Sequence, residues 1–258
     1  MRSVKAGAVV AIAVVAGTAL TGCSSQRTDA TDPGATTTIT VAAAASLADA
    51  MDQLVASYSA AHPGTKVKVT TGSSATLAAQ LAAGAPIDVL ASAGVEVMNR
   101  SISDGTVRAP LDFATNSLEV ATPVKNPAAL RTWTDIARPT VAAARCAVPA
   151  PCGTATDQLL ERSRLTPNFV SEDPDVRAVL TRVRLSQVDA GLVYRTDVQS
   201  AGKSVKGLAI PADVNVSTRY QAAVAVNAGS APAATSFVNY LQSPPAQKIL
   251  GQLGFGPP

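Results

Sequence analysis

The chain has 258 residues, of which 47% are hydrophobic, 15% charged and 3% aromatic, and its formal net charge is +3. This composition excludes a disordered protein, and the near balance of basic and acidic residues argues against a nucleic-acid-binding protein. A single histidine, His62, and three cysteines leave little scope for a histidine-based metal site or a serine–histidine pair.

The first 22 residues are predicted to be a signal peptide. Arg2 and Lys5 precede an apolar stretch over residues 6–20, which is short for a membrane span. The stretch ends in Leu20-Thr21-Gly22-Cys23, which resembles the lipobox of bacterial lipoproteins. The resemblance implies cleavage before Cys23 and acylation of that cysteine, for which we expect palmitate. The alternative is an ordinary signal peptide with a chance cysteine.

Residues 23–37 are expected to form a lipidated, flexible tether, because they are rich in Ser, Thr, Asp, Pro and Gly. Together with the lipobox, this predicts a protein anchored by lipid to the cell membrane, on its extracytoplasmic face.

The next part of the chain alternates short apolar runs with helical patterns. Strands are expected at residues 38–43, 66–70 and 87–91, with helices between them at 47–58 and 76–83. This β-α-β-α-β order favours a mostly parallel sheet covered by helices. Beyond residue 122 the expected elements are strands at 140–144, 190–194 and 220–226, and helices at 156–162, 176–184, 237–241 and 246–253.

Four helices are expected to begin at turns that could hold an anion. Ser46 directly follows the first strand and is a strong candidate for a helix N-cap, and Ser74 lies in a second serine-rich turn. Two more helices begin near Cys152 and Val176, where Pro174 suits a first turn. Helix N-termini present unpaired N–H groups and partial positive charge, and in α/β sheets they gather where ligands bind. The alternative is that each serine only caps its helix.

Several segments resemble the molybdate-binding lipoprotein or periplasmic protein of bacterial ABC transporters, the ModA family. They occur in the family's order, from residue 38 to the C-terminus. These segments are Ala43-Ala44-Ala45-Ser46-Leu47, Gly72-Ser73-Ser74-Ala75-Thr76-Leu77, Gly84-Ala85-Pro86-Ile87-Asp88-Val89, Asn116-Ser117-Leu118, Asp175-Val176-Arg177, Gly191-Leu192-Val193-Tyr194, Pro245-Ala246-Gln247 and Gly254-Phe255.

The resemblance implies a two-lobed α/β fold of the periplasmic-binding-protein type II class, with the ligand in a cleft between lobes joined by two crossover strands. Lobe I is expected to comprise residues 38–120 and 221–258, and lobe II residues 121–220. The implied oxyanion ligands are the hydroxyl and N–H groups of Ser46 and Ser74, the N–H groups of Cys152 and Val176, and the hydroxyl of Tyr194. At the third position the family usually has Pro-Ala-Gly, whereas this chain has Pro151-Cys152-Gly153.

Cys146 and Cys152 are six positions apart. A disulfide between them is favoured by the expected compartment and by the even number of remaining cysteines. Two buried free thiols are the alternative, since the Cα atoms must lie within about 7 Å for a bridge.

We therefore expect a monomeric solute-binding lipoprotein that captures molybdate, and also tungstate, for an ABC permease. We expect no cofactor, no nucleic-acid partner and no catalysis, and molybdenum is bound only as the oxyanion. Alternatives are a sulfate-binding protein of the same fold, a serine hydrolase that uses Ser46 or Ser74 with His62, or a structural lipoprotein. Arg145, Arg177 and Arg195 flank the site segments and are expected to be solvated surface residues.

Overall fold

The computed structural model describes residues 36–258. The predicted signal peptide, the lipid-bearing Cys23 and nearly all of the predicted tether lie outside this range. Within residues 36–258, none of the helices is both long and apolar enough to cross a bilayer.

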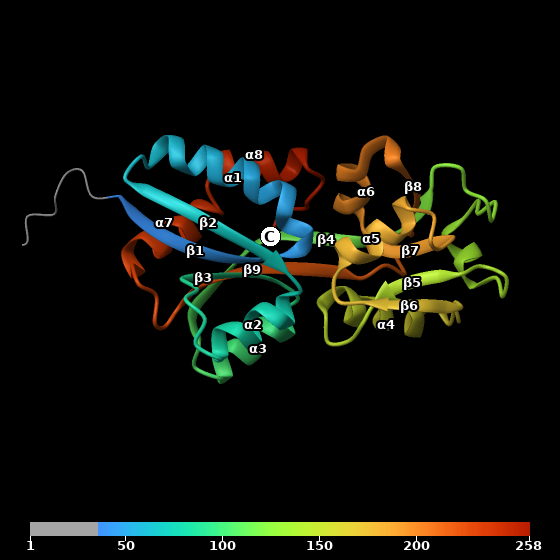
Figure 1. Cartoon of the computed structure of the whole chain (residues 1–258), viewed down its shortest axis with the longest axis horizontal. Helices are drawn as coiled ribbons and strands as arrows, with labels where there is room; N and C mark the ends of the chain where they lie inside the picture. Colours follow the sequence, from blue (N-terminus) through green and yellow to red (C-terminus); the bar gives the residue numbers. More distant parts are fainter. Residues whose placement is uncertain (1–35) are drawn as a thin grey trace, which may run out of the picture. The chain divides into compact units, whose positions relative to one another are not determined.

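Strands and helices alternate along most of the described chain, until β9 follows β8 and two helices end the chain (Figure 1). In chain order the elements are β1 (Thr37–Ala44), the 3₁₀ turn η1 (Ala45–Leu47), α1 (Ala48–Ala61), β2 (Thr65–Gly72), α2 (Ser74–Ala82), β3 (Val89–Ala93), α3 (Val95–Ser103), β4 (Val107–Pro123), the 3₁₀ turn η2 (Trp133–Ala137), β5 (Ala143–Cys146), α4 (Pro151–Ser163), β6 (Phe169–Asp173), α5 (Val176–Arg184), β7 (Ala190–Tyr194), α6 (Arg195–Ala201), the 3₁₀ turn η3 (Gly202–Ser204), β8 (Val205–Ala209), β9 (Ser217–Ala225), α7 (Ala231–Tyr240) and α8 (Pro244–Gln252).

The strands form one continuous path in the order β2-β1-β3-β9-β4-β7-β5-β6, with β8 paired to β4. The long strand β4 joins two halves, because it pairs with β9 as far as Ser117 and with β7 from Leu118 onward. The chain returns between the halves along β9. We call the half that contains β1, β2 and β3 lobe I, and the half that contains β5 to β8 lobe II. The residue boundaries expected for them, at 120 and 220, stay predictions.

Parallel pairing is confined to β1, β2 and β3 in lobe I and to β5, β6 and β7 in lobe II. Strand β1 runs parallel to β2 and β3, and β5 runs parallel to β6 and β7. Strand β9 is antiparallel to β3 and β4, and β4 is antiparallel to β7 and β8. The expectation of a mostly parallel sheet therefore holds only within the lobes, because the two strands that connect them run in opposite directions.

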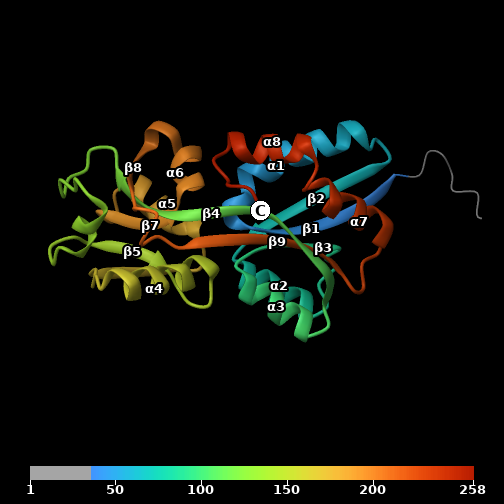
Figure 2. The same ribbon diagram turned by 180° about the vertical axis from the view of Figure 1, so that it is seen from behind.

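Helices cover both faces of the sheet in lobe I. Figures 1 and 2 show α1 and α8 on one side and α2 and α3 on the other. Successive side chains of a strand point to opposite faces. Val41 and Ala43 accordingly pack in the cluster that contains α1, α7 and α8, whereas Ala42 packs with Leu77 and Met98 of α2 and α3. Because helices cover both faces of the sheet, β1 is apolar at every position from Val41 to Ala44.

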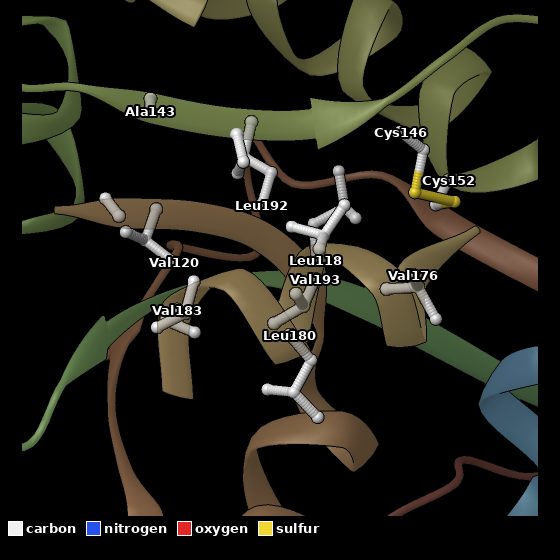
Figure 3. Close-up of a cluster of buried hydrophobic side chains, with 14 of the residues drawn as sticks. Leu118, Val120, Ala143, Cys146, Cys152, Val176, Leu180, Val183, Leu192 and Val193 are labelled. Atoms are coloured by element: carbon white, nitrogen blue, oxygen red, sulfur yellow. A yellow bond between two sulfur atoms is a disulfide. The ribbon is translucent and has the colours of Figure 1, made fainter. Parts of the chain in front are cut away.

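Lobe II has a core of its own, in which β4 and β7 pack against α5 (Figure 3). Leu118 and Val120 of β4 and Leu192 of β7 are almost completely buried. A Cβ atom at Gly191 would lie 2.8 Å from side-chain atoms of Val183. Glycine at this strand position therefore lets α5 approach β7 closely.

Several elements depart from the sequence-based expectations. The strand expected at 140–144 lies at Ala143–Cys146. The hydropathy pattern places a helix only at 156–162, whereas α4 begins at Pro151, as the turn near Cys152 predicts. The helices α3 and α6 and the strands β6 and β8 were not expected at all. Both of these strands are partly exposed, so they lack the continuous apolar run that identifies a buried strand.

Candidate functional site

The five residues expected to bind an oxyanion line one small cavity, although they come from five separate segments. Ser46 and Ser74 belong to lobe I, whereas Cys152, Val176 and Tyr194 belong to lobe II. The cavity measures about 20 Å³, and no member of the set is more than 7% exposed. Topology brings them together, because the carboxyl ends of the parallel strands in both lobes open onto this space. The other lining residues are Ala44, Ala45, Gly72, Ser73, Ala93, Ala150, Pro151 and Asp175.

Ser46 does not cap a helix, so that expectation was wrong. The chain leaves β1 through the 3₁₀ turn η1, which contains Ser46, and α1 begins only at Ala48 without a side-chain cap. The Ser46 Oγ atom instead lies 2.7 Å from the hydroxyl of Tyr220 on β9. The serine is thus tied to a crossover strand rather than to its own helix.

Ser74 is the first residue of α2 and follows the backbone turn at Ser73. Its Oγ atom accepts a hydrogen bond of 3.0 Å from the backbone N–H of Ala93, at the end of β3. A backbone N–H can only donate, so this bond leaves the hydroxyl proton of Ser74 available. Ser74 therefore borders the cavity with a proton to donate.

Cys152 lies in the first turn of α4, where N–H groups have no partner within the helix. It forms a disulfide with Cys146, the last residue of β5, so the expected bridge is present in the structure (Figure 3). A Cβ atom at Gly153 would come within 2.5 Å of the carbonyl oxygen of Ala147. The bridge and the glycine together hold the start of α4 against the end of β5.

Arg145 is buried rather than solvated, which corrects the expectation. Its guanidinium donates to the carbonyl oxygens of Cys146 and Gly153 and forms an ion pair of 2.6 Å with Asp157. It also stacks over the ring of Phe169. The arginine therefore braces the loop that carries Cys152 and does not line the cavity.

Val176 opens α5, whose N-cap is Asp175. The Asp175 Oδ1 atom accepts from the backbone N–H groups of Arg177 and Ala178, at 2.9 and 3.1 Å. Pro174, expected in the first helical turn, instead precedes the cap. The cap uses the second and third N–H groups of the helix and leaves that of Val176 beside the cavity.

Tyr194 ends β7 and lines the cavity with a hydroxyl that has no hydrogen-bond partner among the described residues. Burial raises the pKa of this phenol, so it stays protonated and can donate. The backbone N–H of Tyr194 donates to the Oδ2 atom of Asp197 at 3.0 Å. Asp197 is itself buried, and this burial raises its pKa to about 7.

The cavity is lined by neutral hydrogen-bond donors rather than by positively charged side chains. Among the described residues, none of its lining side chains is lysine, arginine or histidine, and Asp175 is the only carboxylate. Within residues 36–258, no group of three His, Cys, Asp or Glu residues could hold a bare metal ion. The site can therefore offer hydrogen bonds and the positive ends of helix dipoles to an anion.

Two arginines expected at the solvated surface link the lobes near the cavity. Arg177 forms an ion pair with Asp49 of α1, with a separation of 2.5 Å between Nη2 and Oδ2. Arg195 donates from Nη2 to the carbonyl oxygen of Gly254 at 3.0 Å. Neither arginine lines the cavity. The two contacts join lobe II to the α1 and C-terminal segments of lobe I.

His62 is poorly placed to serve Ser46 as a catalytic base. It follows the C-terminal end of α1 and stacks on Tyr58, whereas Ser46 precedes the N-terminal end of the same helix. A helix of 14 residues separates them, which spans about 21 Å. This geometry argues against a hydrolase that pairs this histidine with Ser46.

Sequence reasoning missed four polar residues that surround the site: Asn116, Asp175, Tyr220 and Asp197. Asp175 had a local signal, because an aspartate directly before a helix is a typical N-cap. Asn116 and Tyr220 meet only in the fold, since they are 104 positions apart. No local pattern could have paired them.

Comparison with known proteins places this cavity in context. Residues 39–256 match the family described as bacterial extracellular solute-binding protein. The chain is 34% identical over 254 residues to the molybdate-binding protein ModA of Mycobacterium tuberculosis (strain ATCC 25618 / H37Rv), and the match covers 97% of each chain.

Two solved structures share the fold. One is the periplasmic molybdate-binding protein of Azotobacter vinelandii, with a TM-score of 0.76, 20% identity, and coverage of 85% of this chain and 99% of that one. The other is the sulfate-binding protein SubI from Mycobacterium tuberculosis H37Rv, with a TM-score of 0.75, 20% identity, and coverage of 86% and 87%. At these identities the likeness concerns the fold alone.

Proposed function

The chain belongs to the bacterial extracellular solute-binding proteins and groups with the molybdate-binding ModA proteins. On this premise, we propose that it captures molybdate outside the cytoplasm and delivers it to the permease of an ABC importer. The observation that carries the proposal is the set of neutral donors around one cavity. Its central member is the buried Tyr194 hydroxyl, which has no partner among the described residues.

A site built from donors selects an anion without protons. The proposed donors are the hydroxyl and N–H groups of Ser46 and Ser74, the N–H groups of Cys152 and Val176, and the hydroxyl of Tyr194. All five residues line the cavity. Hydrogen phosphate would find no acceptor for its proton among these donors, and leaving that proton unpaired costs roughly 1–3 kcal/mol. Molybdate, tungstate and sulfate carry no proton at neutral pH and avoid this cost.

Molybdate is favoured over sulfate by kinship rather than by donor chemistry. The ModA relative is 34% identical over nearly the whole chain, whereas the sulfate-binding SubI shares 20% and supports the fold only. Sulfate is therefore one of the anions to be tested against molybdate. Tungstate is proposed as a second ligand of the same size class.

Further parts of the proposal concern the setting of the protein. The lipobox motif at Cys23 supports a palmitoylated lipoprotein anchored to the extracytoplasmic face of the cell membrane. The protein acts as a monomer, needs no resident cofactor, and performs no catalysis. Its partners are the oxyanion and the ABC permease.

Titration calorimetry of the full-length protein with molybdate, tungstate, sulfate and phosphate tests the proposal. We expect tight binding of molybdate and tungstate, and weaker binding of sulfate and of phosphate. Ser46→Ala and Ser74→Ala should each weaken molybdate binding by about 1.5–3 kcal/mol, the value of a hydrogen bond to a charged group.

The control is Ser103→Ala, because this exposed serine of α3 bonds only the carbonyl of Asn99 and lies outside the cavity. Sulfate binding as strong as molybdate binding would move the function to sulfate uptake. Unchanged affinity in both serine variants would reject the site, and the absence of binding to all four anions would reject the function.

A further inference from the structure

A buried chain of polar groups leads from the two crossover strands to the cavity. The Ser46 Oγ atom lies 2.7 Å from the Tyr220 hydroxyl, and the Asn116 Nδ2 atom donates to the same hydroxyl at 3.3 Å. The second proton of this amide goes to the Thr196 Oγ1 atom at 2.8 Å. All four residues are buried, and only Ser46 lines the cavity.

The orientation of the Asn116 amide is fixed by the backbone. Its Oδ1 atom accepts a hydrogen bond of 3.0 Å from the N–H of Ser117. Because a backbone N–H can only donate, this contact identifies the oxygen and assigns the nitrogen to the side of Tyr220. An amide NH₂ group can only donate, so the Tyr220 hydroxyl must accept from Asn116.

The Tyr220 proton then has one place to go. The tyrosine is completely buried, and its hydroxyl contacts only Asn116 and Ser46 among the described residues. Burial raises the pKa of this phenol well above its ordinary value, so the proton stays in place. A buried hydroxyl that donates to nothing is costly. The proton therefore points to Ser46, whose oxygen becomes an acceptor.

We propose that Asn116 and Tyr220 are positioning residues that fix the Ser46 hydroxyl as a donor to the bound oxyanion. With its oxygen occupied by Tyr220, Ser46 has its own proton free to point into the cavity. At Ser46 the site thereby turns the O–H toward the anion, while the Tyr220 hydroxyl holds one lone pair of the serine oxygen. This inference rests on the proposed function, and it adds two selectivity-determining residues that do not themselves contact the ligand.

We call the hydrogen-bonded series Asn116, Tyr220 and Ser46 the relay. The direction in which its hydrogen bonds are donated can be reversed without changing its shape. Aspartate at position 116 has the same size as asparagine but can only accept, so Tyr220 would donate to it and Ser46 would donate to Tyr220. The Ser46 lone pairs would then face the anion. We expect Asn116→Asp to weaken molybdate binding by about 100-fold, the combined effect of a lost donor and a new repulsion.

A double-mutant cycle distinguishes the effect of the added aspartate charge on affinity from the effect of the reversed hydrogen bonds. Tyr220→Phe keeps the ring but breaks the connection, so Asn116→Asp should cost only about tenfold in that background. Tyr220→Phe alone should also narrow the preference for molybdate over hydrogen phosphate, because the Ser46 hydroxyl is then free to accept. Tyr58→Phe is the matched control, since it removes a buried tyrosine hydroxyl that bonds Ser236 away from the cavity.

The measurements are titration calorimetry of the full-length variants with molybdate and phosphate, and thermal unfolding without ligand to check the fold. Equal costs of Asn116→Asp in both backgrounds would show that Asn116 acts through charge alone and would overturn the relay. A Tyr220→Phe variant with the same ligand preference as Tyr58→Phe would overturn it as well, even if Asn116→Asp does not fold.

Failure of the relay is distinguishable from failure of the proposed function. A protein that binds molybdate through Ser46, as judged by Ser46→Ala, yet shows no coupling between positions 116 and 220 rejects the relay alone. A wild-type protein that binds no oxyanion rejects both.

Discussion

The two lobes supply different chemistry to the same cavity. Lobe I contributes the side chains of Ser46 and Ser74 beside the N–H groups of the same residues, and each hydroxyl is hydrogen bonded to a neighbouring strand. Lobe II contributes the first N–H groups of α4 and α5 and the hydroxyl of Tyr194. A hydroxyl is removed by one substitution, whereas a backbone N–H can only be displaced. The two halves of the site should therefore respond to different kinds of change.

The supporting structure differs in the same way. Lobe I holds its serines by hydrogen bonds to β3 and β9, which act directly on the side chains. Lobe II fixes the backbone at the start of α4 through the Cys146–Cys152 disulfide, the close approach of Gly153 to Ala147, and the braces of Arg145. A backbone donor of any side-chain identity, such as Cys152, is therefore suitable in lobe II once the start of α4 is fixed.

The largest effect is expected where lobe II has no space. In Gly153→Ala the new methyl group would overlap the carbonyl oxygens of Ala147 and Cys146, at 2.5 and 2.8 Å. We expect the start of α4 to shift, with a loss of about 3 kcal/mol in the free energy of unfolding and about 100-fold in molybdate affinity. Urea unfolding and calorimetry measure both.

The matched control is Gly251→Ala, because nothing lies within 4 Å of a Cβ atom at this position of α8. This change should leave affinity unaltered and stabilise the helix by about 0.5–1 kcal/mol. Gly153→Ala with wild-type affinity would show that the position of the Cys152 N–H does not matter to the site.

Removing the disulfide of lobe II should have a smaller effect than Gly153→Ala. Its partners are six positions apart, and closing so short a loop stabilises a protein by about 2 kcal/mol. We expect Cys146→Ala together with Cys152→Ala to lower stability by this amount and molybdate affinity about tenfold. Thermal unfolding with and without a reductant provides the check, since the reductant should affect only the wild-type protein.

A pH effect is expected from lobe II alone, because Asp197 is buried behind Tyr194. Its folded pKa of about 7 lies above the ordinary 3.8, so the folded state binds more protons between these values. Stability should therefore fall as pH rises, by about 1.4 kcal/mol between pH 6 and pH 8. Asp197→Asn keeps an acceptor for the Tyr194 N–H and should flatten this dependence. Urea unfolding at both pH values decides, and an equal slope in the variant would contradict the assignment.

Hydropathy and turn chemistry predicted most of the architecture. The strand at Ala190–Tyr194 and the start of α5 at Val176 lie where the sequence pattern puts them. The helix α6 was missed because it has only seven residues and follows β7 without a break. The cap expected at Ser46 failed because the chain first makes a 3₁₀ turn, a choice that the sequence pattern does not reveal.

The site could be predicted only in part, for a physical reason. The strand-to-helix turns mark local donors, but which turns meet depends on how the lobes are connected, and that came from family resemblance. Arg145 shows the limit most clearly: its burial depends on Asp157 and Phe169, which are distant in sequence. Contacts of this kind determine the burial and orientation of charged side chains, and no local sequence pattern predicts them.

A smaller effect is expected from the Asp175 carboxylate of lobe II, which borders the cavity and also caps α5. Asp175→Ser keeps a good cap, so stability should change by less than about 0.5 kcal/mol. Removing the negative charge should tighten molybdate binding about threefold at low salt, and less as salt screens it. Asp189→Asn removes the same charge outside the cavity, from a carboxylate that accepts the Ala142 N–H. An equal gain in that variant would assign the effect to net charge rather than to the site.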